Sequence, residues 1–458
     1  MEDQRKTIKT NLEHYKSKQL ISVIGIAFVL FIVCVIVAAT APPDIFGGSS
    51  LDYKLCTSSQ SNFCFNQFRA ENSAYFEVEL SPLNQIFFLQ VEFDSGTKMN
   101  EELKYDLFIS NSYDLREIKY KEENKTMEIK CSDGDCDSEL LFYIPYIEDK
   151  LYIVDLRFYG EIKVESMKFK IRYITKGFTD FFICTKYFFL AMSLLALGNF
   201  AFYLCKTKTK LRHWAFETKL STFMLFSLVI FNEPLLYYTL REVTFSWTVV
   251  SIFCNAQFCF AIVIFWYLML HSEMSLIRKI ATTIVEASLV FVFVTLLSVM
   301  YSSTIKEQKV NPTFSWESDM PGKAKAAYIA GLSILIILGF IMLTHIVLIL
   351  KKIKNIDKKE RLMFVFNFLM IFTTFLFIGI GAFQPLPRSG TLLLTSVSFF
   401  NIFVIALSWL YTPSLKAFYD KKQENFNGPQ DIEADEKVSS SNKPYDLVNG
   451  DNRDFNRA

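Results

Sequence analysis

The chain has 458 residues, of which 51% are hydrophobic, 16% aromatic and 21% charged. Soluble domains are usually less than half apolar and about a quarter charged, so this composition argues against a soluble enzyme. The 48 Lys and Arg residues nearly balance the 47 Asp and Glu residues, which leaves a net charge of +1 and excludes the basic excess typical of nucleic-acid-binding proteins.

Eight apolar stretches are each long enough to cross a membrane as a helix. A helix rises about 1.5 Å per residue, so about 20 apolar residues cross the roughly 30 Å of hydrocarbon in a bilayer. The chain has 47 Phe but only 16 Gly and 12 Pro, so these stretches are rarely interrupted. The predicted spans are 20–40, 181–205, 220–240, 248–270, 280–302, 326–350, 363–382 and 391–411.

The first span follows a charged arm, residues 1–19. Its apolar run is longer than the 7 to 15 residues typical of a signal-peptide core. We therefore predict an uncleaved signal anchor over residues 20–40. The small residues that precede Pro43 leave cleavage open as the alternative.

Residues 42–177 alternate apolar and polar positions, as in the segments 74–80, 85–93 and 162–172. A period of two residues indicates half-buried strands. Turn signals such as Asp94-Ser-Gly96 and Asp133-Gly134 interrupt these strands. Seven or eight short strands in this length predict a small β-sandwich between the first span and the other seven.

Four of the nine cysteines lie in this predicted β-domain: Cys56, Cys64, Cys131 and Cys136. An even number in an oxidising compartment favours two disulfides, and the short spacings make Cys56–Cys64 and Cys131–Cys136 the simplest of the three pairings. The domain has no His, so we expect no zinc site there. We predict no metal site in the rest of the chain either.

The same domain has one acceptor motif for N-glycosylation, Asn124-Lys-Thr126. The charged residues of 121–125 predict an exposed loop around it. We therefore predict that Asn124 carries a glycan if the domain is lumenal.

The side of the membrane follows from the Lys and Arg residues in the short loops, which collect in the cytoplasm. With the N-terminus inside, the cytoplasmic segments hold eighteen of them and the opposite short loops hold six. The β-domain is thus predicted to be lumenal or extracellular. Residues 412–458 form a cytoplasmic tail that is too polar to fold.

A tyrosine-based sorting motif, Tyr445-Asp-Leu-Val448, lies in this tail. In such motifs an extended segment places a Tyr and an aliphatic side chain in two pockets of an adaptor. Clathrin adaptors are therefore candidate partners, although short motifs of this kind also arise by chance.

Polar residues in three spans form the candidate functional site. Glu233, Asn255 and Gln257 are expected at similar depths near the lumenal side, and Asn401 lies near the middle of the last span. Pro234 removes a backbone donor, so the third span should kink there. The site has three interpretations: hydrogen bonds between helices, contact with a ligand or cargo, or a proton or ion relay.

Two further ionisable residues have no such grouping. Glu286 has no obvious partner at its depth and is expected to extend toward the headgroups, and His345 lies close enough to a span end to reach the interface. We find no catalytic motif and no phosphate-binding glycine loop, so we expect neither an enzyme nor a cofactor, although a bound lipid is compatible with the sequence.

Four stretches carry a resemblance to a known family: Ala41-Pro-Pro43, Gly177-Phe-Thr179, Asn232-Glu-Pro234 and Trp409-Leu-Tyr-Thr-Pro-Ser414. In their order and spacing the chain resembles the Wntless-type seven-transmembrane family, and within it the transmembrane protein 181 branch. The resemblance covers residues 20–420. It implies a lumenal domain similar to the Golgi-dynamics β-sandwich and a receptor-like helical bundle with a cavity open toward the bilayer.

The resemblance also implies traffic among the Golgi, endosomes and the plasma membrane. We expect a multi-pass membrane protein that binds membrane lipid, or a lipidated or secreted protein cargo, and assists protein transport. The alternatives are a cell-surface receptor, either G-protein-coupled-receptor-like or toxin-binding, and an ion-conducting protein. G-protein coupling is disfavoured because the fourth span ends in Leu270-His-Ser-Glu-Met274, without an Asp-Arg-Tyr motif.

Overall fold

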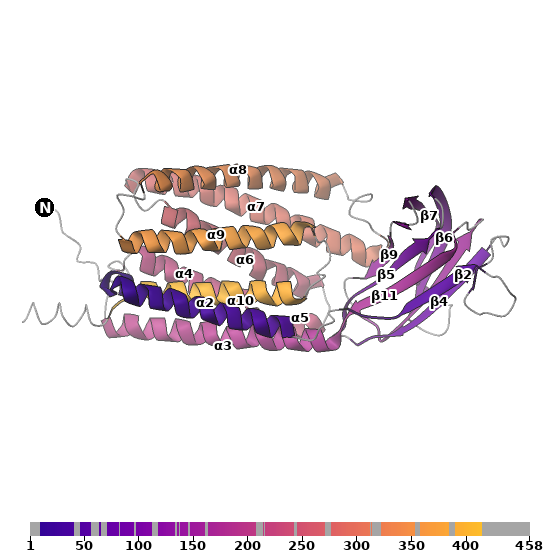
Figure 1. The fold of residues 1–458 in the computed structure, drawn as a ribbon, viewed down its shortest axis with the longest axis horizontal. Helices are drawn as coiled ribbons and strands as arrows, with labels where there is room; N and C mark the ends of the chain where they lie inside the picture. Colours follow the sequence, from indigo (N-terminus) through magenta and orange to yellow (C-terminus); the bar gives the residue numbers. More distant parts are fainter. Residues whose placement is uncertain are drawn as a thin grey trace, which may run out of the picture.

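The computed structural model describes residues 10–414, except for 41–45, 56–63, 66–70, 82, 96–97, 112–117, 133–134, 137, 145–146, 161–163, 208–213, 215, 242–244, 271–275, 312, 314–321, 353–357 and 384–389. Figure 1 shows a long bundle of helices with a β-domain at one end. The fold class predicted from the sequence is confirmed: this is a multi-pass helical membrane protein with an N-terminal apolar helix and a β-sandwich before the remaining helices.

The helices follow the predicted spans closely. A short helix, α1 (Asn11–His14), precedes the anchor helix α2 (Ser17–Thr40). The bundle continues with α3 (Lys176–Thr207), α4 (Phe216–Phe231), α5 (Leu236–Arg241), α6 (Phe245–Leu270), α7 (Leu276–Val310), α8 (Gly322–Lys352), α9 (Lys358–Phe383) and α10 (Gly390–Tyr411).

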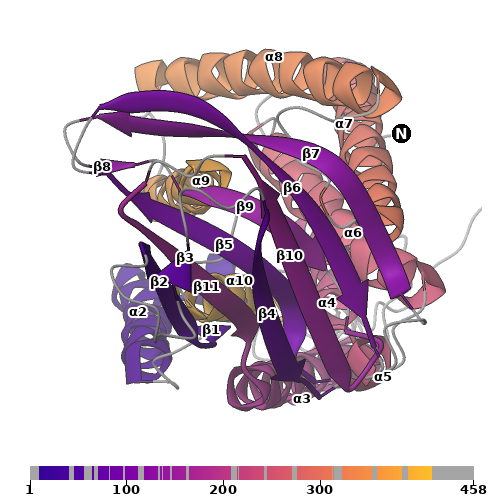
Figure 2. The same cartoon turned by 90° about the vertical axis from the view of Figure 1, so that its right-hand side faces the viewer.

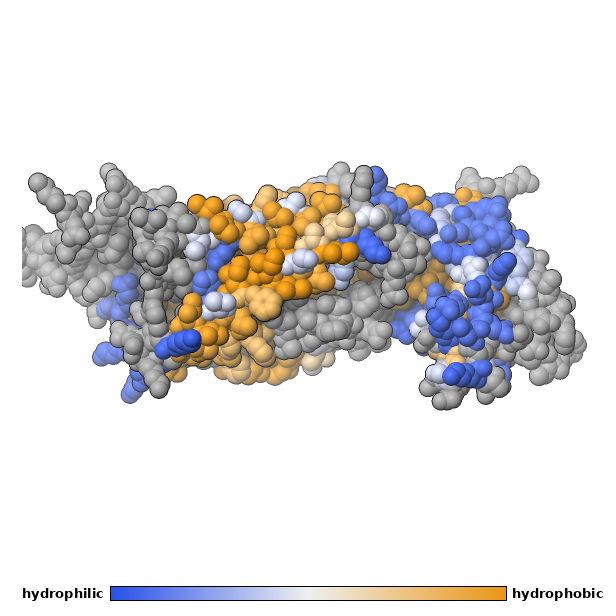
Figure 3. Space-filling model, turned by 90° about the horizontal axis from the view of Figure 1, so that it is seen from above, coloured by the Kyte–Doolittle hydropathy of each residue, from blue (hydrophilic) through white to orange (hydrophobic). Residues whose placement is uncertain are grey.

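Seven helical segments in the described part are long and apolar enough to cross a membrane, with α4 and α5 counted as one segment. The remaining predicted span, 363–382, corresponds to α9, in which the described apolar stretch, Arg361–Thr374, is shorter. Figure 3 shows apolar residues along the side of the bundle, with hydrophilic residues toward both ends. This distribution is the one expected when lipid surrounds the middle of the bundle.

The β-domain is built from two four-stranded antiparallel sheets. One has the order β4 (Glu71–Glu79), β10 (Leu151–Tyr159), β6 (Met99–Ser110) and β7 (Ile118–Ser132). The other has the order β9 (Glu139–Ile144), β5 (Gln85–Asp94), β11 (Ser166–Ile174) and β2 (Ser50–Leu55). The shorter strands are β1 (Phe46–Gly47), β3 (Cys64–Phe65) and β8 (Asp135–Cys136), and β8 pairs with both β7 and β5.

The alternating sequence explains the sandwich. In β11 the side chains of Met167, Phe169 and Ile171 are buried, while the intervening residues are less buried. Phe169 meets Phe76 of the opposite sheet at a ring distance of 5.3 Å. Side chains of alternating positions from two sheets thus form one apolar core, as the period of two predicts.

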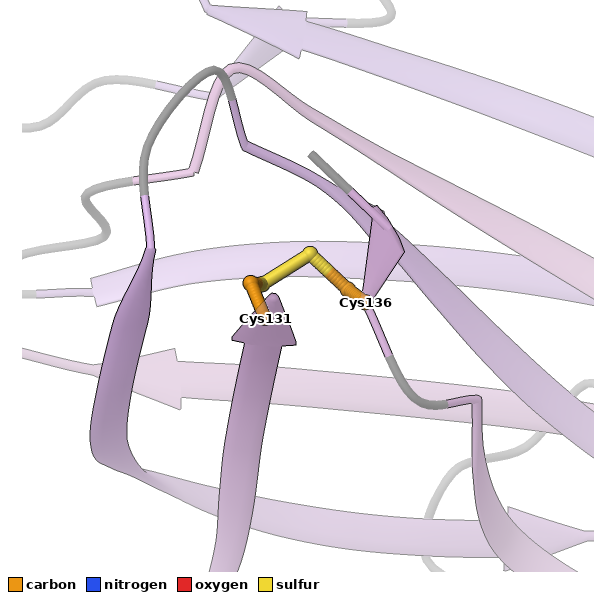
Figure 4. The surroundings of a disulfide bond; sticks show 2 residues. All are labelled: Cys131 and Cys136. Carbon is orange, nitrogen blue, oxygen red and sulfur yellow. A yellow bond between two sulfur atoms is a disulfide. The ribbon is translucent and has the colours of Figure 1, made fainter. Parts of the chain in front are cut away.

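One predicted disulfide is present. Cys131 at the end of β7 is bonded to Cys136 in β8 (Figure 4). The other predicted pair, Cys56 and Cys64, lies outside the described residues because Cys56 does, and so do the sorting residues Tyr445 and Val448.

The loop expected around Asn124 is wrong, because residues 118–132 form the continuous strand β7. Asn124 lies at an irregularity opposite Asp106, has a positive φ of 57° and donates its backbone N–H to the Asp106 carboxylate at 2.7 Å. Its side chain is exposed, so the acceptor position remains accessible. Asn tolerates this left-handed conformation better than most residues, which explains how a charged, exposed segment remains in the sheet.

The N-terminal arm and the end of the last helix meet at the end of the bundle opposite the sandwich. The backbone N–H of Asn11 donates to the carbonyl of Thr412 at 2.9 Å, and the indole of Trp409 donates to the Tyr15 hydroxyl at 3.1 Å. Figure 1 places the start of α2 and the sandwich at opposite ends of the bundle. Residues 10–15 and the β-domain therefore lie at opposite ends of the apolar helices.

The helices form two packed groups. In the first, α10 packs against α2, α3 and α4, and α9 lies along α2 and α10; in the second, α7 packs between α6 and α8. Contacts between α4 and α6 join the groups. Viewed from the sandwich end, α8 extends across the top of the bundle while α2, α3 and α10 are seen nearly end-on (Figure 2), so α8 is inclined to them.

Candidate functional site

The third predicted span is interrupted at Glu233. Helix α4 ends at Phe231 and α5 begins at Leu236. Pro234 has no N–H to continue the helical hydrogen bonds, and Glu233 has a φ of 49° in the left-handed region, which a helix interior does not allow. The break therefore turns the Glu233 side chain into the protein and leaves a helix end inside the bundle.

A lysine from α3 lies at this helix end. The ammonium of Lys186 donates to the carbonyl of Phe231 at 2.8 Å and to Oε1 of Glu233 at 3.3 Å. It also lies 4.2 Å from the centre of the Phe231 ring. Because Lys186 and Glu233 are only 2% and 6% exposed, each charge depends on the other for stabilisation.

Two neutral side chains of α6 complete the surroundings of Glu233. The Ser251 hydroxyl donates to Oε2 at 2.7 Å, and the Asn255 amide donates to Oε1 at 3.0 Å. Of these partners of Glu233, Asn255 was in the predicted site and Lys186 was not. Lys186 was missed although an ionisable side chain within an apolar span is a functional candidate.

Asn401 is paired with Asn232, a residue that the predicted site did not include. Its side-chain amide and that of Asn232 bond to each other in both directions, at 2.7 and 3.0 Å, and neither residue is exposed. Asn232 directly precedes Glu233, so this pair ties α10 to the same break in α4. We call Lys186, Asn232, Glu233, Ser251, Asn255 and Asn401 the lumenal polar network, after the side of the membrane on which we expect them from the sequence.

Gln257 is not part of this network. It faces α4, where its amide donates to the Ser227 hydroxyl at 2.7 Å. The structure thus brings together Glu233 and Asn255 as predicted. It connects Asn401 to them only through Asn232, and Gln257 contacts α4 nearly two turns away from Glu233. What the lumenal polar network does directly is hold α3, α4, α6 and α10 in fixed register.

A second buried pair joins α7 and α8. Nε2 of His345 lies 3.1 Å from Oε1 of Glu286, and Glu286 is 4% exposed. The expectation that Glu286 extends toward the headgroups is therefore wrong, because a partner lies at its own depth. Tyr267 of α6 packs its ring edge-on to His345 and donates its hydroxyl to the carbonyl of Leu338 in α8 at 2.7 Å.

The sandwich is attached to the bundle by polar contacts after α7. The hydroxyl of Tyr120 in β7 bonds to Asn311 at 2.7 Å, and the ammonium of Lys125 donates to the Thr313 carbonyl at 3.2 Å. Burial and the neighbouring carboxylate of Glu122 raise the pKa of Tyr120 above its usual range. The phenol therefore remains protonated at physiological pH and can donate a hydrogen bond across this joint.

Among the described residues, no group of three or more His, Cys, Asp or Glu side chains lies close enough together to hold a metal ion. The chemistry that these spans offer is hydrogen bonding, ion pairing and apolar contact.

A family model described as "Wntless-like, transmembrane domain" matches residues 175–415. This range is more than half of the chain and includes every helix from α3 to α10. A search of curated proteins found no match.

Proposed function

We propose that this chain, which belongs to the Wntless-like transmembrane family, binds a lipid or a lipid-modified protein within its helical bundle and assists its transport. The observation that carries the proposal is the family match, because it covers the whole bundle from α3 to α10. The four sequence stretches that resemble the transmembrane protein 181 branch support a place near that branch.

The interior of the bundle is apolar and aromatic, the chemistry that an acyl chain requires. Beside the lumenal polar network, Phe231 and Phe258 stack with ring centres 4.3 Å apart, and Phe258 meets Phe400 at 5.6 Å. Aromatic and aliphatic walls bind an apolar chain without a need for charged groups. The sandwich on the lumenal end offers a separate folded surface for the protein part of a cargo.

The lumenal polar network has a supporting role in this proposal. Lys186, Ser251 and Asn255 donate four hydrogen bonds to Glu233 and the Phe231 carbonyl, so these donors are already engaged within the protein and the network holds helices rather than contacting the ligand. Among the three interpretations of the sequence, this arrangement favours hydrogen bonds between helices. Carriage, not catalysis, is the proposed activity, and the compartments are the Golgi, endosomes and plasma membrane, with adaptor binding through Tyr445 and Val448.

A binding assay with matched probes tests the proposal. The full-length protein, purified in lipid nanodiscs, is titrated with a fluorescent peptide that carries a palmitoyl group and with the same peptide without it. We expect saturable binding of the acylated peptide at least tenfold tighter than binding of the plain peptide.

Two controls separate specific binding from partition into lipid. Empty nanodiscs should bind the acylated peptide without saturation, and unlabelled palmitoylated peptide should displace the labelled one from the protein. If the acylated peptide binds equally to empty nanodiscs and to the protein, the bundle is not a lipid carrier.

A further inference from the structure

A group of lysines lies where the N-terminal arm meets the start of α9. The ammonium of Lys359 donates to the carbonyl of Glu13 at 2.9 Å, although 346 positions separate the two residues in the chain. Lys16 and Lys18 follow Glu13 closely, and Lys358 directly precedes Lys359. This contact brings together two short segments that contain Lys16, Lys18, Lys358 and Lys359, which we call the basic arm cluster.

The arm itself is held by the end of α10. The backbone N–H of Asn11 donates to the carbonyl of Thr412 at 2.9 Å, and its side-chain amide donates to the carbonyl of Trp409 at 3.1 Å. The Trp409 indole donates in turn to the hydroxyl of Tyr15. The last carbonyls of a helix lack their usual partners, so the arm supplies hydrogen bonds that the end of α10 needs. The backbone that carries Lys16 is therefore fixed relative to the bundle.

The ammonium groups of the basic arm cluster have no acidic partner among the described residues. Only Lys359 makes a side-chain hydrogen bond there, and its acceptor is a neutral carbonyl. The sandwich differs, since six of its lysines pair with Asp or Glu side chains: Lys119, Lys121, Lys125, Lys130, Lys168 and Lys170. Like charges near one another repel, so the basic arm cluster favours an anion from outside the chain.

The start of α2 adds to this positive potential. The helix begins at Ser17, between Lys16 and Lys18, and its first turn contains no acidic residue. The N-terminal end of a helix has a partial positive charge and free N–H groups, and both favour an anion. Residues 10–20 and 358–361 together contain five Lys or Arg residues against two Glu residues, in a chain whose net charge is only +1.

The helix surfaces next to the cluster face lipid. In the apolar window of α2 only 11% of the residues are buried, and Ile21, three residues after Lys18, is 54% exposed. On α9, Val365 lies two helical turns after Lys358 on the same face and is 42% exposed. A molecule bound to the cluster therefore meets positive charge at the helix ends and apolar side chains along the helices. This combination fits an anionic lipid better than an acidic protein or a free anion.

We propose that the basic arm cluster binds the headgroup of a polyanionic lipid, a phosphoinositide of the leaflet that surrounds the starts of α2 and α9. This end of the bundle is the one predicted to be cytoplasmic, and groups of four or more Lys and Arg residues beside a membrane helix are typical of phosphoinositide binding. The phosphates bind the ammonium groups, and the acyl chains lie along the helix faces near Ile21 and Val365. The site is separate from any ligand in the bundle interior.

A displacement assay on the full-length protein in detergent tests the proposal. The probe is a fluorescent dioctanoyl phosphatidylinositol 4,5-bisphosphate. The competitors are the same lipid without the label, dioctanoyl phosphatidylserine, and inositol 1,4,5-trisphosphate, which is the headgroup without acyl chains. We expect the unlabelled bisphosphate lipid to displace the probe at concentrations at least tenfold lower than either of the other two.

Charge-removing variants locate the site. Lys16→Gln and Lys358→Gln each remove one exposed ammonium from a different segment, and each should weaken probe binding about fivefold, the contribution of one lysine near an anionic lipid. The double variant should lose about 25-fold. Lys206→Gln is the matched control, because Lys206 is exposed at the end of α3, which packs against α4 and α10 rather than α9. It should change the affinity less than twofold.

Several results would overturn the proposal. Parent-like binding by a double variant that melts at the temperature of the parent would show that the two lysines do not hold the headgroup. An equal loss in Lys206→Gln, or equal displacement by phosphatidylserine, would reduce the effect to unspecific charge, and equal displacement by inositol 1,4,5-trisphosphate would mean a soluble ligand. Binding of the palmitoylated peptide should be unchanged in the double variant, so this test fails or succeeds independently of the proposed function.

Discussion

The α4–α5 segment with α10, and the hairpin of α7 and α8, differ in how much of each helix is inside the protein. In the apolar windows of the α4–α5 segment and α10, 56% and 61% of the residues are buried, whereas in α7 and α8 the shares are 12% and 17%. Both regions nevertheless contain a buried carboxylate, Glu233 in the first and Glu286 in the second. A buried carboxylate therefore occurs both in helices that lie mostly inside the protein and in helices that lie mostly at its surface.

The partners of the two carboxylates explain the difference. Glu233 faces Lys186, which is protonated in water and needs a counter-charge when buried. Glu286 faces His345, whose imidazole can bond to it without a charge. The first pair lies at the junction of four helices, and the second joins a helical hairpin that lipid largely surrounds. Loss of the first should therefore disturb the whole bundle, and loss of the second only the hairpin.

The largest expected effect is that of Glu233→Gln. The substitution keeps the shape but leaves the ammonium of Lys186 buried without a counter-charge, which costs about 3–5 kcal/mol. Thermal unfolding of the purified protein should show a large loss of stability, and retention in the endoplasmic reticulum should rise. Wild-type stability for this variant would mean that Lys186 and Glu233 are not an ion pair.

An intermediate effect is expected at the Asn232–Asn401 pair, because both groups are neutral. Asn401→Leu, Asn232→Leu and the double variant form a cycle whose coupling energy should be about 0.6–1.7 kcal/mol, the range of interhelical hydrogen bonds in membranes. Reversible unfolding in mixed detergent measures it. A coupling near zero would show that α10 is held to α4 by apolar packing alone.

The smallest effect should come from Glu286→Gln, the matched partner of the first substitution. A Gln side chain can still bond to His345, so the global loss should be below about 1 kcal/mol. The local consequence is measurable by hydrogen exchange, which should accelerate in α8 near His345 and remain unchanged in α10. Equal losses for Glu286→Gln and Glu233→Gln would remove the distinction between the two regions.

The sequence predicts the order of the elements well, because span length and strand periodicity are local properties. It also identifies Glu233, Asn255 and the break at Pro234, since a carboxylate and a proline are both unusual within an apolar span. It does not predict the partners. Glu286 and His345 are 59 residues apart, and helices that are apolar on all sides give no periodic signal for the face that meets a neighbour.

The same reasoning changes one expectation about Glu233. From the sequence alone, Glu233→Leu should spare folding and weaken only ligand capture, because lipid tolerates Leu. With Lys186 as the neighbour, that single substitution leaves a buried charge and should itself impair folding. A test of ligand binding therefore has to remove both charges together.

The double variant Lys186→Met/Glu233→Leu provides the most direct measurement of the central claim, that the lumenal polar network supports the bundle while lipid binds in its apolar interior. Replacing both charges with apolar side chains of similar volume should restore much of the stability that either single substitution loses. The quantity to measure is the affinity of the folded double variant for the palmitoylated peptide in nanodiscs. We predict an affinity within about threefold of the parent protein; a folded, stable double variant that no longer binds the acylated peptide would contradict the account and make Glu233 and Lys186 the ligand site.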